Sequence, residues 1–166
     1  SHTVVELQNS GYEVVIVDNL SNSSADVVDN IEKVSGIRPA FEKLDCLDLE
    51  GMDKLFTKYP GIKGIIHFAA SKAVGESVQK PLLYYRNNLV SLINLLELMP
   101  KHGVEGIIFS SSCTVYGQPD VLPVTEEAPI KKAESPYGNT KQINEEIIRD
   151  TVASGSPINA IMLRYF

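Results

Sequence analysis

The stretch EGIIFSSS, residues 105–112, decides the fold class. Ile107, Ile108 and Phe109 form a short, continuous apolar run that ends in three serines. A run of this length and composition is typical of a strand that is buried on both faces, as in a parallel sheet. The run GIIHFAA, residues 64–70, has the same character. Both runs are therefore predicted to be buried strands of one parallel sheet.

Strand-like and helix-like segments alternate on either side of these two runs. Further strands are expected at residues 12–18, 39–45 and 158–166. Helices, indicated by apolar residues at helical spacing, are expected at residues 2–11, 24–34, 49–59 and 79–103, and from about residue 137. This alternation predicts an α/β fold, a doubly wound Rossmann-type parallel sheet with helices on both faces.

Acidic residues at the strand ends mark a candidate cofactor site, because ligands of such folds bind at the carboxyl ends of the strands. Asp18 ends the second strand of the pattern, where a carboxylate accepts hydrogen bonds from the adenosine ribose of NAD and repels the 2′-phosphate of NADP. The alternative is an ordinary turn or cap residue. Asp45 is a weaker candidate, since Asp48 could equally cap the next helix.

The stretch SPYGNTK, residues 135–141, indicates the start of a helix. Pro136 suits a first helical turn and Ser135 can cap it. Tyr137 and Lys141 would then be neighbours on one helix face, so that an ammonium group can act on a phenol. The alternative is a chance Tyr-x-x-x-Lys pattern, with a packed ring and a solvated lysine.

Length and composition limit the possible partners. The chain has 166 residues, 43% of them hydrophobic, and a net charge of −6. One domain with a real core is expected, with neither nucleic acid nor an anionic membrane surface as partner. No stretch approaches the ~20 apolar residues of a membrane span, and no signal peptide is recognisable, which favours a cytoplasmic protein. Cys46 and Cys113 are expected to be reduced, and no metal site is predicted.

The beginning of the chain lacks the phosphate-binding glycines of a dinucleotide fold. Ser1 opens directly into the first expected helix, so the first strand and its glycine-rich turn are expected immediately upstream. In the strand order 3-2-1-4-5-6 that first strand is central. We therefore expect a gap in the sheet and a chain that does not fold stably alone.

Six motifs carry a resemblance to a known family. They are SHTVVEL (1–7), DNLSNS (18–23), IHFAASKAVGESVQKPLLYYRNN (66–88), IFSSSCTVYG (108–117), SPYGNTK (135–141) and LRYF (163–166). In order and spacing they resemble the UDP-glucose 4-epimerases of the extended short-chain dehydrogenase/reductase superfamily. The segment 72–81 is characteristic of that branch. Ala70 and Ser71 stand where many members have Gly-Leu, and Cys113 where alanine is usual.

The resemblance implies an NAD-dependent epimerase that interconverts UDP-galactose and UDP-glucose through transient oxidation at sugar C4 to a 4-keto intermediate. Tyr137 would be the acid/base, with Lys141 favouring its phenolate and binding the nicotinamide ribose. Ser112 would bridge the sugar O4 and the tyrosine, and Thr114 would make a further sugar contact. Ser110 and Ser111 are interpreted instead as groups that satisfy strand-end carbonyls.

The same matching implies a set of cofactor-binding residues, of which Lys72 has the alternative of a solvated surface lysine. The set is Asp18, Asn19, Leu20, Ser21, Asn22, Ser23, Asp45, Cys46, Phe68, Ala69, Ala70, Ser71, Lys72, Asn87, Ser112, Tyr137, Lys141 and Phe166.

The long helices are expected to serve the core and the subunit interface. His67 is predicted to be a core histidine, and core or interface positions are expected for Tyr84, Tyr85, Leu89, Leu92, Leu95 and Leu96. In the family, helices like 83–101 and 137–153 pair across a two-fold axis, which implies a homodimer. A smaller substrate domain follows LRYF in the family, so residues 1–166 are expected to be a cofactor domain truncated at both ends, and inactive as printed.

Two alternatives remain. One is another extended short-chain enzyme acting on nucleotide sugars, a 4,6-dehydratase or a decarboxylase. Dehydratases typically carry Asp-Glu directly after the active-site threonine, whereas here Val115 and Tyr116 follow Thr114. The other is a non-catalytic NAD-binding sensor, a class that usually loses the tyrosine or the lysine. Acceptance of N-acetylated sugars would depend mainly on residues beyond Phe166.

Overall fold

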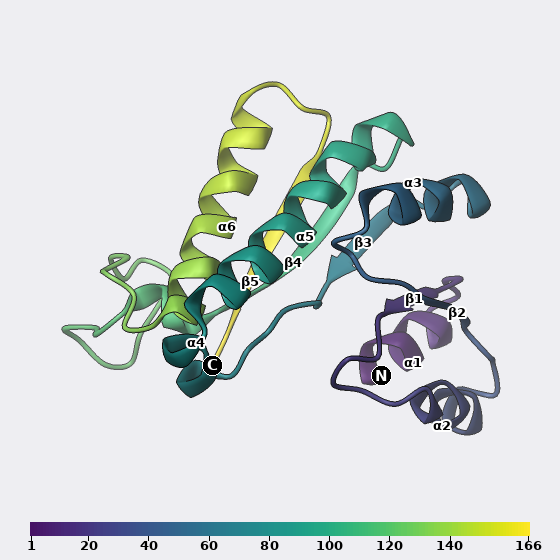
Figure 1. The fold of residues 1–166 in the computed structure, drawn as a ribbon, viewed down its shortest axis with the longest axis horizontal. Coiled ribbons are helices and arrows are strands. Elements are labelled where there is room, and N and C mark those ends of the chain that lie inside the picture. Colours follow the sequence, from purple (N-terminus) through teal and green to yellow (C-terminus); the bar gives the residue numbers. More distant parts are fainter. The chain divides into compact units, whose positions relative to one another are not determined.

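A computed structural model describes all residues from Ser1 to Phe166. The chain divides into two compact units, Ser1–Gly51 and Met52–Phe166, and the boundary falls within helix α3 (Leu49–Lys58). Each unit has its own parallel sheet (Figure 1).

The first unit is built from two strands and two helices. Strands β1 (Val15–Asp18) and β2 (Ala40–Lys43) are parallel, in a register that pairs Val15 with Ala40 and Asp18 with Lys43. Helices α1 (His2–Asn9) and α2 (Asp26–Ser35) pack against each other. The buried Gln8 of α1 also ties this helix to the chain after α2, because its Nε2 donates to the Ile37 carbonyl at 3.1 Å.

The second unit contains the three-stranded parallel sheet β3-β4-β5. Its strands are β3 (Gly64–His67), β4 (Gly106–Ser112) and β5 (Asn159–Tyr165). Its other elements are α4 (Val74–Gln79), α5 (Pro81–Lys101), the 3-10 helix η1 (Cys113–Tyr116) and α6 (Pro136–Ala153). Helix α6 packs against α5, β4 and β5, and Figure 1 shows α5 and α6 side by side.

The predicted parallel α/β fold is confirmed, as is the break in the sheet. The strand at 15–18 pairs only with that at 40–43, and the strand at 64–67 begins a separate sheet. The helix expected over 79–103 is interrupted at Lys80, where φ is −130° and ψ is 57°. Because proline disfavours helical backbone in the residue before it, Pro81 starts a new helix. Helix α4 and the 3-10 helix η1 were not predicted.

The core of the second unit lies along α5 and β4. Tyr84 and Leu92 are fully buried, as are Ile107 and Phe109 within a few per cent. The predicted core histidine, His67, is buried and its ring stacks on Phe109 with centroids 6.1 Å apart. None of the helices combines the length and apolar composition that a membrane span requires.

Candidate active site

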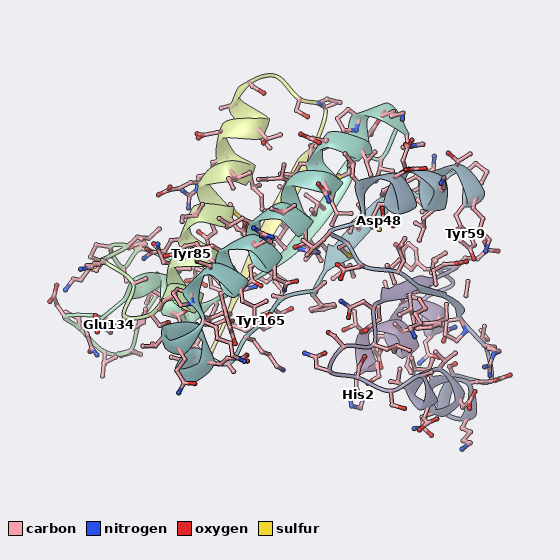
Figure 2. The ribbon with its side chains drawn as sticks, in the orientation of Figure 1. His2, Asp48, Tyr59, Tyr85, Glu134 and Tyr165 are labelled. Atoms are coloured by element: carbon pink, nitrogen blue, oxygen red, sulfur yellow. The ribbon has the colours of Figure 1, made fainter.

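The predicted start of helix α6 is confirmed. Ser135 is the N-cap, and its Oγ accepts a hydrogen bond from the Gly138 N–H at 3.1 Å. Pro136 occupies the first turn, where its missing N–H costs no intrahelical bond. Asn139 donates from Nδ2 to the Tyr85 hydroxyl at 2.7 Å, which ties this turn to α5; Figure 2 labels Tyr85.

Lys141 is buried, so the alternative of a solvated lysine is wrong. Only 4% of its surface is exposed, and its Nζ donates to the Ser110 carbonyl at 2.7 Å. The Nζ lies 4.8 Å from the centroid of the Phe109 ring and 5.8 Å from that of Tyr137. Burial lowers the pKa of Lys141 from 10.5 to about 8. An ammonium group has three donors, and the protein uses one of these for a hydrogen bond.

Ser112 ends β4, two residues beyond the Ser110 carbonyl to which this lysine donates. Its Oγ accepts from the Thr114 N–H at 3.3 Å and so caps η1, which leaves the serine proton available for a ligand. Ser110 and Ser112 lie two residues apart on one strand, so their side chains share a face. The Thr114 hydroxyl is buried and has no hydrogen-bond partner, so its predicted sugar contact remains a prediction.

The interpretation of Ser111 as a group that satisfies strand-end carbonyls is wrong, whereas that of Ser110 stays a prediction. The Ser111 hydroxyl donates to the Glu145 carboxylate at 2.6 Å, and the Ser110 carbonyl is satisfied by Lys141. Glu145 was not singled out in the sequence. It is fully buried and paired with Arg164 of β5. A glutamate one turn beyond Lys141 on the same helix face was the signal that could have indicated it.

The segment after β3 is held by Asn88, a second residue that sequence reasoning missed. Ser71 donates its N–H to Asn88 Oδ1 at 2.8 Å, and Asn88 Nδ2 donates to the Ser71 carbonyl at 2.9 Å. The predicted Asn87 donates to the Ser71 hydroxyl at 3.2 Å. Asn88 also donates to Thr140 of α6 at 3.0 Å. Ser71 is thus linked through Asn88 to α6, whereas Phe68, Ala69 and Lys72 are exposed.

The first unit carries the acidic strand ends. Asp18 Oδ1 accepts from the Leu20 N–H at 2.7 Å and from the Ser23 hydroxyl at 2.8 Å, whereas Oδ2 accepts no hydrogen bond. Asn19 Nδ2 donates to Asp45 at 2.9 Å, so the ends of β1 and β2 are joined. The alternative for Asp48 is confirmed, since its carboxylate accepts from the Gly51 N–H in the first turn of α3.

The two cysteines form no disulfide, as predicted. Burial, reinforced by the carboxylates of Asp45 and Asp18, raises the pKa of the Cys46 thiol to about 11. This thiol is therefore protonated at neutral pH. Phe166, at the other end of the predicted set, is largely exposed and stacks on Tyr116 with ring centroids 6.5 Å apart.

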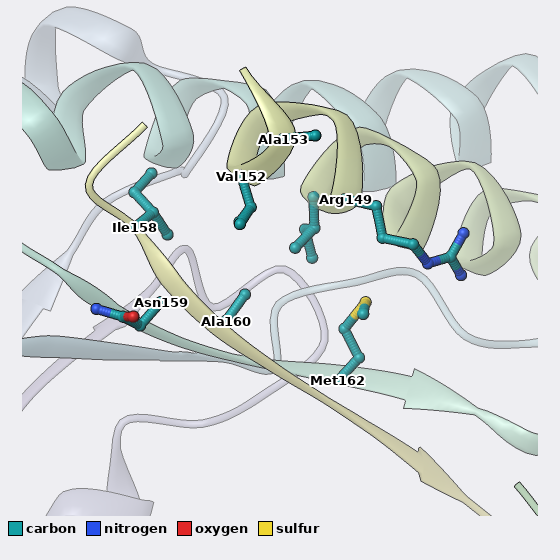
Figure 3. Close-up of a pocket in the computed structure, with 8 residues that line it drawn as sticks. Arg149, Val152, Ala153, Ile158, Asn159, Ala160 and Met162 are labelled. Atoms are coloured by element: carbon teal, nitrogen blue, oxygen red, sulfur yellow. The ribbon is translucent and has the colours of Figure 1, made fainter. Parts of the chain in front are cut away.

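A hollow of ≈ 460 Å³ lies away from these residues, between the last turns of α6 and the start of β5 (Figure 3). Its lining is mainly apolar and begins at Ile148, two turns beyond Lys141. A second hollow, of ≈ 250 Å³, is lined in part by Tyr85, Ser135 and Asn139 at the start of α6. Only the second adjoins the helix turn that carries Tyr137.

Parallel strands that alternate with helices, and polar residues at the carboxyl ends of those strands, define a Rossmann-type α/β fold. The chain belongs to the NAD dependent epimerase/dehydratase family, because the model of that family matches residues 1–166.

Curated relatives place the chain more finely. It is 49% identical to the UDP-glucose 4-epimerase of Bacillus subtilis and 46% identical to that of Homo sapiens, over the whole chain in both cases. It covers 48% and 49% of those proteins, so the chain spans about half the length of the curated relatives it matches. A crystal structure of UDP-glucose 4-epimerase from Bifidobacterium longum in complex with NAD+ and UDP aligns with a TM-score of 0.96 at 45% identity, over 99% of this chain and 49% of that one.

Proposed function

We propose that the protein is an NAD-dependent UDP-glucose 4-epimerase, which interconverts UDP-galactose and UDP-glucose and serves galactose metabolism. The relatives named above support the substrate class. The observation that carries the chemistry is the buried ammonium of Lys141, held 5.8 Å from the Tyr137 ring by the Ser110 carbonyl. A burial cost of this kind is typical of functional sites.

The residues present fit NAD. Asp18 Oδ2 is a carboxylate oxygen with no partner in the protein, as an acceptor for ribose hydroxyls requires. Lys141 keeps donors for a second ribose, and Ser112 keeps its hydroxyl proton. Phe68 and Lys72 are exposed at the end of β3, where a cofactor can reach them.

Bound NAD would supply a reversible hydride acceptor for C4 of the sugar. Tyr137 would take the proton of the C4 hydroxyl and later return it, with the Lys141 cation stabilising the phenolate between the two events. Ser112 would donate to the sugar oxygen while that oxygen carries partial negative charge. Inversion would require the oxidised sugar to present its other face, so Ser112 and Tyr137 would have to hydrogen-bond the sugar oxygen in both orientations.

The dehydratase alternative gains no support from the structure of η1. The two residues that follow Thr114, Val115 and Tyr116, are both buried, and neither is a carboxylic acid. The Tyr116 phenol accepts a hydrogen bond from Arg164, and these positions lack the Asp-Glu pair that is typical of dehydratases.

The test of the proposal is conversion of UDP-galactose to UDP-glucose by the purified full-length protein with NAD, because residues 1–166 alone are expected to be inactive. Tyr137→Phe should lower the rate by about 10²–10⁴-fold, since general acid–base groups contribute that much. Tyr12→Phe, at an exposed tyrosine of the first unit, is the matched control and should leave the rate unchanged. A wild-type protein without conversion, or a Tyr137→Phe variant at full rate, would overturn the proposal.

A homodimer in the cytoplasm is part of the same proposal. Leu82, Leu83 and Val90 of α5 expose apolar surface, as a helix that pairs with a second copy requires. The lack of a disulfide between Cys46 and Cys113 agrees with a reducing compartment. A net charge of −6 supports a small-molecule substrate over nucleic acid.

A further inference from the structure

A buried cluster of charged residues lies one turn beyond Lys141 on α6, and the proposed chemistry does not use it. Its centre is Glu145, which is 0% exposed. Oε1 accepts from the Ser111 hydroxyl at 2.6 Å and from Arg164 Nε at 2.9 Å. Oε2 accepts from Arg164 Nη2 at 2.7 Å and from Arg149 Nη2 at 2.8 Å. Four donors therefore converge on one carboxylate.

The carboxylate is ionised in this position. Burial alone would raise the pKa of Glu145, but the hydrogen bonds from Arg164 and Ser111 outweigh it and hold that pKa below its ordinary value. Arg164 engages Glu145 through two N–H groups at once, the bidentate geometry that fixes orientation as well as distance.

Stability is a poor explanation for such a pair. Two charges lose their hydration on burial, and well-packed apolar residues of similar volume often replace a buried ion pair without loss of stability. What this ion pair supplies is a directional, bidentate geometry between the groups that it joins. The question is therefore which groups it joins.

The cluster joins α6, β4, β5 and η1, of which α6 and β4 carry Tyr137, Lys141 and Ser112. On α6, Glu145 lies one turn beyond Lys141 and two turns beyond Tyr137. Two residues of α6 bind successive residues of β4: Lys141 donates to the Ser110 carbonyl, and Glu145 accepts from the Ser111 hydroxyl. The next residue of β4 is Ser112.

Arg164 extends the cluster to the other side of Ser112. It is the register partner of Ser111 on β5. Its Nη1 donates to the Tyr116 hydroxyl at 2.9 Å, and its guanidinium carbon lies 4.8 Å from the centre of the Tyr116 ring. Tyr116 belongs to η1, the short helix that Ser112 caps. Contacts of the cluster thus fix the chain before and after Ser112.

We propose that Glu145 is a positioning residue for the reaction: its ion pair with Arg164 and its bond to Ser111 fix α6 on β4 and so set Tyr137 and Lys141 against Ser112. This inference rests on the proposed function for its kinetic consequence. Its structural consequence, the placement of Lys141, stands apart from that function.

Two variants test the proposal in the purified full-length protein. Glu145→Gln keeps the shape but turns an amide NH₂ towards guanidinium donors, so the helix must move to relieve the contact. Arg164→Lys keeps the charge but loses the fork that makes two bonds. For both, kcat should fall about 10- to 100-fold while the KM for UDP-galactose changes less than about 3-fold, because misplacement affects the reacting groups more than binding. Glu146→Gln, at the exposed acid next along α6, is the matched control and should change neither.

A second readout separates positioning from loss of charge. NMR of lysine labelled at Cε reports the pKa of Lys141 directly. Displacement of Lys141 from its buried place would raise that pKa towards 10.5, since hydration favours the ammonium form. Loss of a negative charge alone would lower it. His67, buried against Lys141 and neutral because burial and then the Lys141 charge lower its pKa to about 4, does not titrate in this range.

Both variants are therefore expected to raise the pKa of Lys141, Arg164→Lys without any change of net charge. A pKa unchanged or lowered in the folded Arg164→Lys variant would overturn the positioning role, whatever becomes of Glu145→Gln. If the wild-type protein lacks epimerase activity while the pKa of Lys141 rises in the variants, the proposed function fails and the positioning role stands. If activity is present and kcat is unchanged in both variants, the positioning role fails and the proposed function stands.

Discussion

The burial of Lys141 lowers the stability of the fold and places a cation next to Tyr137. An ammonium group that is 4% exposed and bonded to one carbonyl has given up most of its hydration. The lowered pKa of Lys141, about 8, measures that loss. The charge is retained at neutral pH, where it can stabilise a phenolate at Tyr137. A residue selected for stability alone would be apolar at this place.

Lys141→Met should therefore stabilise the protein while removing activity. We expect the free energy of unfolding at pH 7 to rise by about 1–3 kcal/mol, because the cost of burying the charge disappears. Thermal and urea denaturation measure this, with the exposed Lys33→Met as control. A Lys141→Met variant less stable than the wild type would show that the cation is structural.

The pH dependence of this gain has a definite sign. Below about pH 8 the lysine is charged in both the folded and unfolded states, and the burial cost is present in full. Above about 10.5, its ordinary pKa, it is neutral in both states and the cost is absent. The stability advantage of Lys141→Met should thus shrink between these pH values. Wild-type kcat/KM should fall over the lower part of the same window, since the cation is lost as pH rises through about 8.

Asp18 is the residue of the first unit on which the proposed NAD binding depends most. Its Oδ1 is occupied by Leu20 and Ser23, and its Oδ2 is free. Asp18→Asn should lower the affinity for NAD about 10-fold, the effect of about 1.4 kcal/mol, with little change in stability. Calorimetric titration with NAD measures the affinity, and Asp26→Asn on the exposed start of α2 is the control. Equal affinity of wild type and Asp18→Asn would place the ribose elsewhere.

At the scale of elements, the sequence predicted the strands and most helices because their signals are local. Apolar runs gave β3 and β4, and Ser135 with Pro136 gave the start of α6. Helix α4 was missed because it has only six residues and no side-chain cap. Candidate site residues at the strand ends followed from the same alternation.

The sequence did not predict the polar contacts between elements. Glu145 pairs with Arg164 nineteen residues away, and Asn88 bonds Ser71 across seventeen. Both are polar residues on helices, and pattern alone assigns such residues to a solvated face. Only the packing of α5 and α6 turns Asn88 and Glu145 inward. The residues that position the site were therefore hidden, whereas those that would react were recognisable.

The end of η1 depends on one glycine. Gly117 has φ 59° and ψ −135°, a region that other residues avoid, and a Cβ there would lie 2.6 Å from the Lys132 carbonyl oxygen. Gly117→Ala should destabilise the protein by about 2 kcal/mol or more, through strain and this contact together.

A glycine on α4 provides the comparison for this prediction. A Cβ at Gly75 would meet nothing within 4 Å, and the backbone there is helical. Gly75→Ala should be neutral or stabilising by about 0.5–1 kcal/mol. Urea denaturation of both variants checks the pair, and a Gly117→Ala variant as stable as Gly75→Ala would refute the backbone argument.

At the scale of the whole molecule, each unit carries its own share of the candidate residues. The first supplies the acidic strand ends at Asp18 and Asp45, and the second supplies Ser112, Tyr137 and Lys141. The separation of the two sheets follows the expected break between the second and fourth strands of the pattern. The assignment of adenosine to the first unit and of nicotinamide and sugar to the second is part of our proposal.

The fate of the hydrogen at sugar C4 tests the central claim most directly. UDP-galactose carrying deuterium at C4 would be incubated with the protein and NAD, and the UDP-glucose formed would be analysed by NMR. Transient oxidation moves that hydrogen as hydride and returns it, so our account predicts UDP-glucose with deuterium retained at C4 and none exchanged with water. Product in which C4 carries hydrogen from the solvent would contradict the account, because it would mean that the C4 hydrogen leaves as a proton.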